Sequence, residues 1–216
     1  MHLKLGSPVH CEGAPAGELA DIVIDPTSRR VTHVVVQPRH RHYEARLVPI
    51  DRVRPDGAGI ALDCSAAELE QLDPVQESAY LRLGEFPVAD PDWEIGVQSI
   101  LALPLYPEAD GLVTSMGPDP HVTVTYDRIP KGEVEIRRAS AVMSADGHHL
   151  GHVDGFVVEA DELVGGVVLE RGHLWGRREV VIPYGAVAQV ETDSITLSLS
   201  KDQVGALETR RFHRWF

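Results

Sequence analysis

Short runs of β-branched and other apolar residues, separated by turn residues, follow one another along most of the chain. The segments 18–25 and 31–38 are rich in Val and Ile and are bounded by Gly, Pro and Asp, and so are 152–159 and 164–171. Runs of this length and composition are typical of β-strands. The pattern therefore predicts a mainly β protein built from many short strands and turns.

The pattern occurs twice. The segment 6–72 matches the segment 139–207 at an offset of 133 to 135 residues, and the strand-like runs fall in the same order in both. Each copy also has a run that contains a proline, Pro49 in the first and Pro183 in the second. Because proline cannot donate to a strand ladder, we expect both prolines at strand ends or edges.

Each copy ends in a helix signal. Ser65 with Glu68, and Ser200 with Gln203, fit the capping box, in which the serine and the residue three positions on satisfy each other's backbone amides. Apolar residues follow at helical spacing. We therefore expect a short helix at the end of each copy, covering one end of a small β-barrel.

Glycines, valines and one hairpin recur at matched places in the two copies. In the first they are Gly13, Ala16-Gly17, Asp21, Val34-Val35-Val36, Leu47-Val48-Pro49 and Val53, and in the second Asp146-Gly147, Gly151 to Asp154, Gly172 to Gly176 and Glu179 to Pro183. These motifs resemble the PRC-barrel family, and the likeness covers 6–72 and 139–207. The resemblance implies two tandem small barrels, as in some bacterial members. It also implies a docking role, because the familiar relatives, the cytoplasmic domain of the photosynthetic reaction centre H subunit and the C-terminal domain of a ribosome maturation factor, bind other proteins with the barrel.

Four segments are expected: a first barrel at 1–73, a connector at 74–132, a second barrel at 133–209 and a basic-aromatic tail at 210–216. The connector is rich in proline and carboxylates, but it also carries apolar side chains that are too numerous to stay in water. Because long structureless loops are uncommon in compact proteins, we expect it to pack on the barrels, with a strand at 122–126.

Charge and cysteine content restrict the partners and the compartment. The net charge of −13 disfavours nucleic acid, since phosphate backbones repel an acidic chain. No apolar run approaches the length of a membrane span. The two cysteines, Cys11 and Cys64, are too few for a disulfide framework, so reduced thiols in a core are expected. Together these features favour a cytoplasmic protein.

The sequence lacks the common catalytic and nucleotide-binding motifs, so we expect no enzyme, no catalytic residue and no cofactor. Candidate partner-binding residues instead lie in two hairpins and the tail. They are His40 in the first hairpin, His173, Trp175, Arg177 and Arg178 in the second, and Arg210, Arg211, Phe212, Trp215 and Phe216 in the tail. The tail either docks on its own protein or serves as an arm, for which a protein partner fits better than a lipid surface.

The most metal-like stretch contains His148, His149 and His152 beside Asp146. Neighbouring residues of a strand point to opposite faces, so His148 and His149 should diverge, and solvated turn residues are the simpler interpretation. The sequence thus favours a non-enzymatic protein-interaction or scaffold module with an unidentified protein partner, as a monomer or a homodimer. The alternative is a small-ligand or metal-binding sensor.

Overall fold

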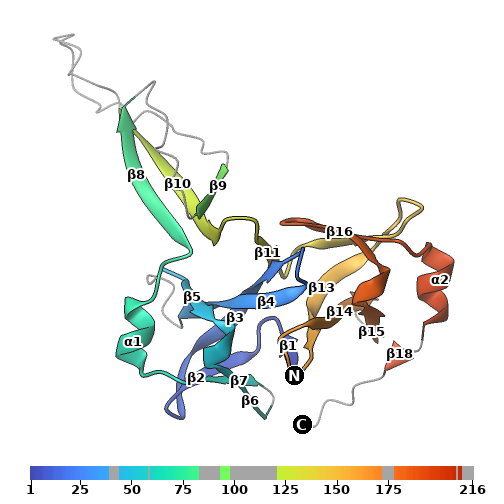
Figure 1. Ribbon diagram of the computed structural model, residues 1–216, viewed down its shortest axis with the longest axis horizontal. Coiled ribbons are helices and arrows are strands. Elements are labelled where there is room, and N and C mark those ends of the chain that lie inside the picture. The colour runs from blue at the N-terminus through green and yellow to red at the C-terminus, as the bar shows by residue number, and fades with distance from the viewer. Residues whose placement is uncertain are drawn as a thin grey trace, which may run out of the picture. The chain divides into compact units, whose positions relative to one another are not determined.

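The computed structural model describes residues 1–38, 44–57, 59–82, 93–97, 121–171, 178–207 and 209–210 (Figure 1). These residues form two compact units, one made of Met1–Pro74 with Gly132–Phe216 and the other of Val75–Lys131. Both copies of the repeat thus belong to the first unit. The candidate residues His40, His173, Trp175, Arg177, Arg211, Phe212, Trp215 and Phe216 lie outside the described residues.

The predicted strands form in both copies. The first copy contains β2 (Pro8–Cys11), β3 (Ala14–Asp25), β4 (Arg30–Pro38), β5 (Arg46–Pro49), the 3-10 helix η1 (Ile50–Arg52), β6 (Val53–Asp56), β7 (Gly59–Leu62) and α1 (Ala66–Gln71). The second contains β12 (Ala141–Met143), β13 (His149–Val158), β14 (Val164–Arg171), β15 (Arg178–Pro183), the 3-10 helix η2 (Tyr184–Ala186), β16 (Val187–Glu191), β17 (Ser194–Leu197), α2 (Lys201–Ala206) and β18 (Thr209–Arg210). Pro49 and Pro183 end β5 and β15, as predicted.

The two copies have the same strand order. The first sheet runs β5-β4-β3-β2-β7-β6 and the second β15-β14-β13-β12-β17-β16, with β18 added beside β15. In both, one pair is parallel, β2 with β7 and β12 with β17, and the other neighbours are antiparallel. Within the described residues no ladder joins the end strands of either sheet. Closure into barrels, with the helices at their ends, therefore stays a prediction.

Two short strands cross between the copies, and the sequence pattern did not predict them. The strand β1 (His2–Lys4) precedes the first copy but pairs with β13 of the second, with Leu3 opposite Phe156. The strand β11 (Val134–Arg137) precedes the second copy but pairs with β3 of the first, with Ile136 opposite Ile22. Each sheet thus takes its extra strand from the segment that leads into the other copy (Figure 1).

The turns at the tips of β3–β4 and β13–β14 join the copies a second time. The Val31 amide donates to the Glu162 carbonyl at 3.0 Å, and the Val164 amide donates to the Arg29 carbonyl at 2.8 Å. Arg29 and Glu162 have matching positive φ angles of 63° and 68°. The exchange is therefore reciprocal, and a single hydrophobic core runs through both sheets.

Both capping boxes are present. The Ser65 hydroxyl accepts from the Glu68 amide in α1, and the Ser200 hydroxyl accepts from the Gln203 amide in α2. Each helix buries one apolar side chain, Leu69 or Val204, in the common core. This matches the predicted apolar spacing of both segments.

The second unit contains a separate three-stranded sheet. Its strands are β8 (Gln76–Arg82), β9 (Trp93–Val97) and β10 (His121–Pro130), in the order β8-β10-β9. The strand predicted at 122–126 is thus confirmed as the centre strand of this sheet. The expected packing of the connector on the barrels stays a prediction.

Candidate functional site

Strand β15, which follows the second hairpin in the sequence, begins at the same end of one ladder at which β18 ends. Strand β15 begins at Arg178, and β18 ends at Arg210. The two strands are antiparallel, with Glu179 opposite Arg210 and Val180 opposite Thr209. The covalent connections to the second hairpin and to the tail therefore lie side by side. We call this place the β15–β18 edge.

One member of each group of candidate residues lies in this ladder. Arg178 of the hairpin group begins β15 and Arg210 of the tail group ends β18, although they are 32 positions apart in the chain. Helix α2 ends at Ala206, and the chain then turns into the short strand β18 beside β15. The backbone of Arg210 thus pairs with Glu179, the residue directly after Arg178.

An ionic cluster lies next to the edge. Lys4 of β1 donates a hydrogen bond to the Glu179 carboxylate, with 2.6 Å between Nζ and Oε1, and its Nζ lies 2.9 Å from Asp154 Oδ2. The Asp154 side chain is only 4% exposed, and that of Glu179 15%. Burial of a carboxylate requires such a partner. The exchanged strand β1 therefore supplies one cation that both carboxylates beside the edge share.

The electrostatics of the cluster depend on these hydrogen bonds. Burial lowers the pKa of Lys4, but the hydrogen bond to Glu179 and the negative charges of Asp154 and Glu179 outweigh it, so the pKa lies above its ordinary 10.5. The neighbouring His2 has its pKa lowered, mainly by burial, against the opposing charge of Glu179. Lys4 is therefore the cation of the cluster at neutral pH.

A pH titration of Lys4→Met tests the cluster. A raised pKa in the folded state means that the charged form of Lys4 stabilises the fold below pH 10.5 and that this contribution is lost as the pH rises through the higher folded value. We expect wild type to be more stable than Lys4→Met at pH 7. The difference in their free energies of unfolding should shrink in alkali. Urea unfolding followed by circular dichroism at several pH values measures the gap. A constant gap up to pH 12 would contradict the role of the charge.

The corresponding edge of the first copy is arranged differently. The Leu47 amide of β5 donates to the Asp73 carbonyl at 2.9 Å, and Arg46 Nη1 donates to the Leu72 carbonyl at 3.1 Å. Arg46 also forms an isolated bridge with Pro74, after which the chain enters β8. The returning segment is thus the connector in the first copy and the tail in the second.

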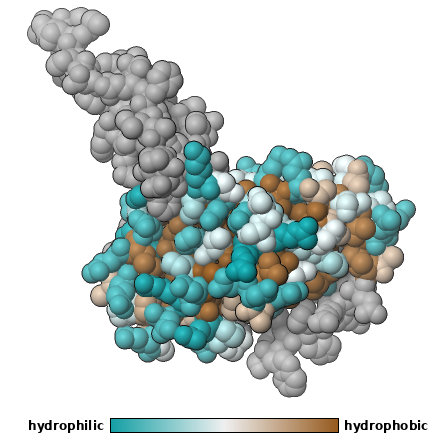
Figure 2. Space-filling view, in the orientation of Figure 1, coloured by the Kyte–Doolittle hydropathy of each residue, from teal (hydrophilic) through white to brown (hydrophobic). Residues whose placement is uncertain are grey.

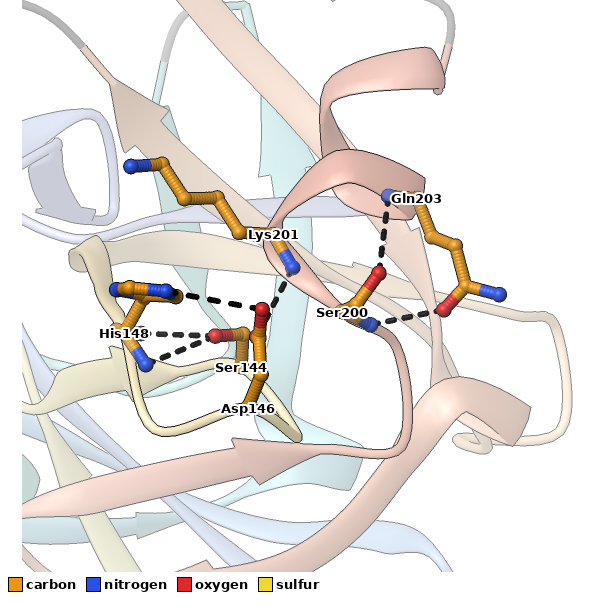
Figure 3. A network of polar contacts seen from close by, with 6 residues as sticks. All are labelled: Ser144, Asp146, His148, Ser200, Lys201 and Gln203. Atoms are coloured by element: carbon orange, nitrogen blue, oxygen red, sulfur yellow. Dashed lines mark hydrogen bonds and ion pairs between the residues drawn. The ribbon is translucent and has the colours of Figure 1, made fainter.

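The histidine stretch is divided between two surroundings. His148 lies 3.7 Å from Asp146 in the turn between β12 and β13, and its amide donates to the Ser144 hydroxyl (Figure 3). His149 and His152 instead contact each other edge to face, with ring centroids 4.9 Å apart. In the part of the chain that the structure describes, no three His, Cys, Asp or Glu side chains are placed to hold a metal ion.

Asp146 has a structural partner. Its Oδ1 accepts from the Lys201 amide at 3.1 Å, at the first turn of α2, next to the Ser200–Gln203 capping box (Figure 3). Hydrogen bonds from Ser144 and then from the backbone of Lys201 lower the pKa of Asp146. This carboxylate therefore ties the β12–β13 turn to the start of the helix.

The surface shows no large apolar face in the view of Figure 2, where hydrophobic residues are interspersed with hydrophilic ones. No helix among the described residues is long and apolar enough to cross a membrane.

Comparison with curated proteins gave no match. Residues 138–204 match the family model of the PRC-barrel domain, which covers β12 to β17 and most of α2, so the second copy is similar to this family.

Proposed function

We propose that this protein is a non-enzymatic protein-interaction or scaffold module made of two PRC-type barrels, and that it binds its partner at the β15–β18 edge. The family match of the second copy and the equal strand order of the first support the two-barrel arrangement. The observation that carries the docking site is the pairing of Glu179 with Arg210, which puts the residue after Arg178 beside the first residue of the tail.

The residue types at this edge suit a protein interface. Arginine and tryptophan dominate the residues that contribute most to binding between proteins. The hairpin supplies Trp175, Arg177 and Arg178, and the tail from Arg210 supplies three arginines and three aromatic residues. The nearby carboxylate of Glu179 already has Lys4 as its partner. Because the hairpin and the tail carry arginines and aromatic residues, the protein that binds here should present an acidic segment with apolar side chains.

The experiment is a crosslinking pull-down with mass spectrometry from the native cell. It compares wild type, Trp175→Ala and a chain stopped after Arg210, which keeps both residues of β18. If the edge is one site, both variants lose the same protein from the captured set. His42→Ala is the matched control, because His42 takes the place of Trp175 when His40 is aligned with His173, and it should retain that protein.

Circular dichroism of each variant verifies that the fold is intact. Capture of the same proteins by wild type, Trp175→Ala and the shortened chain would overturn the docking site. Turnover of a defined substrate that is lost on a single substitution would overturn the non-enzymatic role.

A further inference from the structure

Two histidines of strand β13 come together on the surface of the second sheet. The rings of His149 and His152 have 4.9 Å between their centroids and 65° between their planes. Both residues are exposed. His148, the third histidine of this stretch, instead lies 3.7 Å from Asp146 in the preceding turn. The pair is therefore separate from the contacts of Asp146 that tie the turn to α2.

A β-bulge explains how residues three positions apart reach the same face. On a regular strand, positions 149 and 152 would point to opposite sides. Here the register between β12 and β13 shifts, so that His149 and Gly151 stand opposite neighbouring residues of β12 and Leu150 is left without a partner in that ladder. The Leu150 side chain is buried. Since a bulge redirects the side chains beside it, His149 is turned to the face of His152.

The first copy shows that this fold does not need histidines at these places. It has the same shift of register between β2 and β3. In that bulge Pro15 takes the place of His149, and Glu18 takes the place of His152. The strand pairing is thus satisfied by other side chains, so the fold alone does not account for the two histidines.

The spacing of the two rings fits two ligands of one metal ion. A bond from a metal ion to a histidine nitrogen is about 2.0–2.1 Å long, and this nitrogen lies about 1.1–1.2 Å from the centre of its own ring. Two imidazoles in neighbouring positions of one ion, about 90° to 110° apart, therefore have ring centres about 4.5–5.2 Å apart. The observed separation of 4.9 Å falls within this range.

A hydrogen bond prepares His152 for this role. Its Nδ1 lies 3.1 Å from the Ala139 carbonyl oxygen. This oxygen can only accept, so Nδ1 carries the proton and Nε2 keeps its lone pair. Metal-bound histidines usually donate their other ring nitrogen in this way, which fixes the tautomer and the orientation of the ring. Among the described residues no third His, Cys, Asp or Glu side chain is placed to join the pair, so water completes the coordination.

We propose that His149 and His152 form a surface site for a late first-row divalent cation, with Cu²⁺ bound most tightly. Imidazole suits Cu²⁺, Zn²⁺ and Ni²⁺, and the affinity of a given site is highest for Cu²⁺. The net charge of −13 attracts cations to the surface of the chain. Because water holds the remaining positions, the bound ion can also accept a ligand from outside the chain. The site does not depend on the docking function proposed for the β15–β18 edge.

The test adds Cu²⁺ to the full, untagged chain and follows binding by isothermal titration calorimetry and electron paramagnetic resonance. We expect one ion at this site, with two imidazole nitrogens in its hyperfine pattern. His149→Ala and His152→Ala should each weaken this binding about tenfold or more, since even the loss of a hydrogen-bond partner of a ligand costs about 10–100-fold. His148→Ala, which changes the neighbouring histidine, is the matched control and should bind as wild type does.

Circular dichroism verifies that each variant is folded. Equal copper binding by wild type and by the double variant His149→Ala, His152→Ala would overturn the proposal, because the ion would then be held by other residues. A loss in His148→Ala as large as that in His149→Ala would also overturn it, since the turn would then be the site. So would a wild-type spectrum with only one imidazole nitrogen at the ion.

Discussion

Leu3→Ala should destabilise the protein by about 2–5 kcal/mol, the usual range for truncating a fully buried leucine. Leu3 is the centre residue of β1, only two positions from the first residue of the chain, and it is 0% exposed. Its side chain belongs to the core that both copies share. Pairing with β13 holds this short strand in the second sheet.

The reciprocal exchange provides a matched variant. Ile136 occupies in β11 the place that Leu3 occupies in β1, and it is also 0% exposed. Ile136→Ala should therefore cost a similar free energy, and the measurement for both is urea unfolding followed by circular dichroism. Glu70→Ala, on the exposed side of α1, is the surface control and should change stability by less than about 0.5 kcal/mol.

A loss below about 0.5 kcal/mol for Leu3→Ala, with a full loss for Ile136→Ala, would contradict the exchange of β1. The first sheet would then hold β11 while the second sheet did without β1. Equal, large losses in one cooperative transition would instead show that the two copies fold as one unit.

Much of the fold could be predicted because its signals are local. Runs of Val and Ile with turn residues at their ends mark the strands, and the serines at 65 and 200 mark the helix starts. The repeat adds a check, since each copy predicts the other. The exchanged strands could not be predicted, because they have three and four residues, which is too few for a period-2 pattern. One signal was present: His2-Leu3-Lys4 and Glu135-Ile136-Arg137 both read polar, apolar, cationic at an offset of 133.

The candidate site depends on contacts that no local pattern encodes. The hydrogen bond from Lys4 to Glu179 joins residues 175 positions apart. The ladder between β15 and β18 contains only two residue pairs, so its register could not be read from the composition of the tail. The sequence therefore indicates residue types that would suit docking, and the structure adds that β15 and β18, which carry Arg178 and Arg210, are paired.

A single glycine decides whether β1 can approach the second sheet. Gly155 lies in β13 opposite Lys4, and a Cβ at this position would lie 2.2 Å from the Leu3 carbonyl oxygen and 3.0 Å from Lys4 Cα. Both are backbone atoms, which cannot rotate away as a flexible side chain can. Gly155→Ala should therefore displace β1 and destabilise the fold by at least about 1–3 kcal/mol, the range for overpacking.

Gly205→Ala is the opposite case. Gly205 lies inside α2, it is exposed, and a Cβ there would meet nothing within 4 Å. Because alanine is a better helix former than glycine, this substitution should stabilise the protein by about 0.5–1 kcal/mol. Replacing glycine by alanine should thus lower the free energy of unfolding at position 155 and raise it at position 205, as measured in the same unfolding experiment.

Hydrogen exchange then locates the damage in Gly155→Ala. The amides of Leu5 and Val158 donate to the carbonyls of Asp154 and Met1, so they report on the β1–β13 seam. They should lose protection, while the amides of the β3–β11 ladder keep theirs. The first copy has Asp21 at the matching position, opposite Arg137, so a side chain is accommodated in that seam. Unchanged stability and protection in Gly155→Ala would mean that β1 can shift to the spacing of β11, and that the close approach is not required.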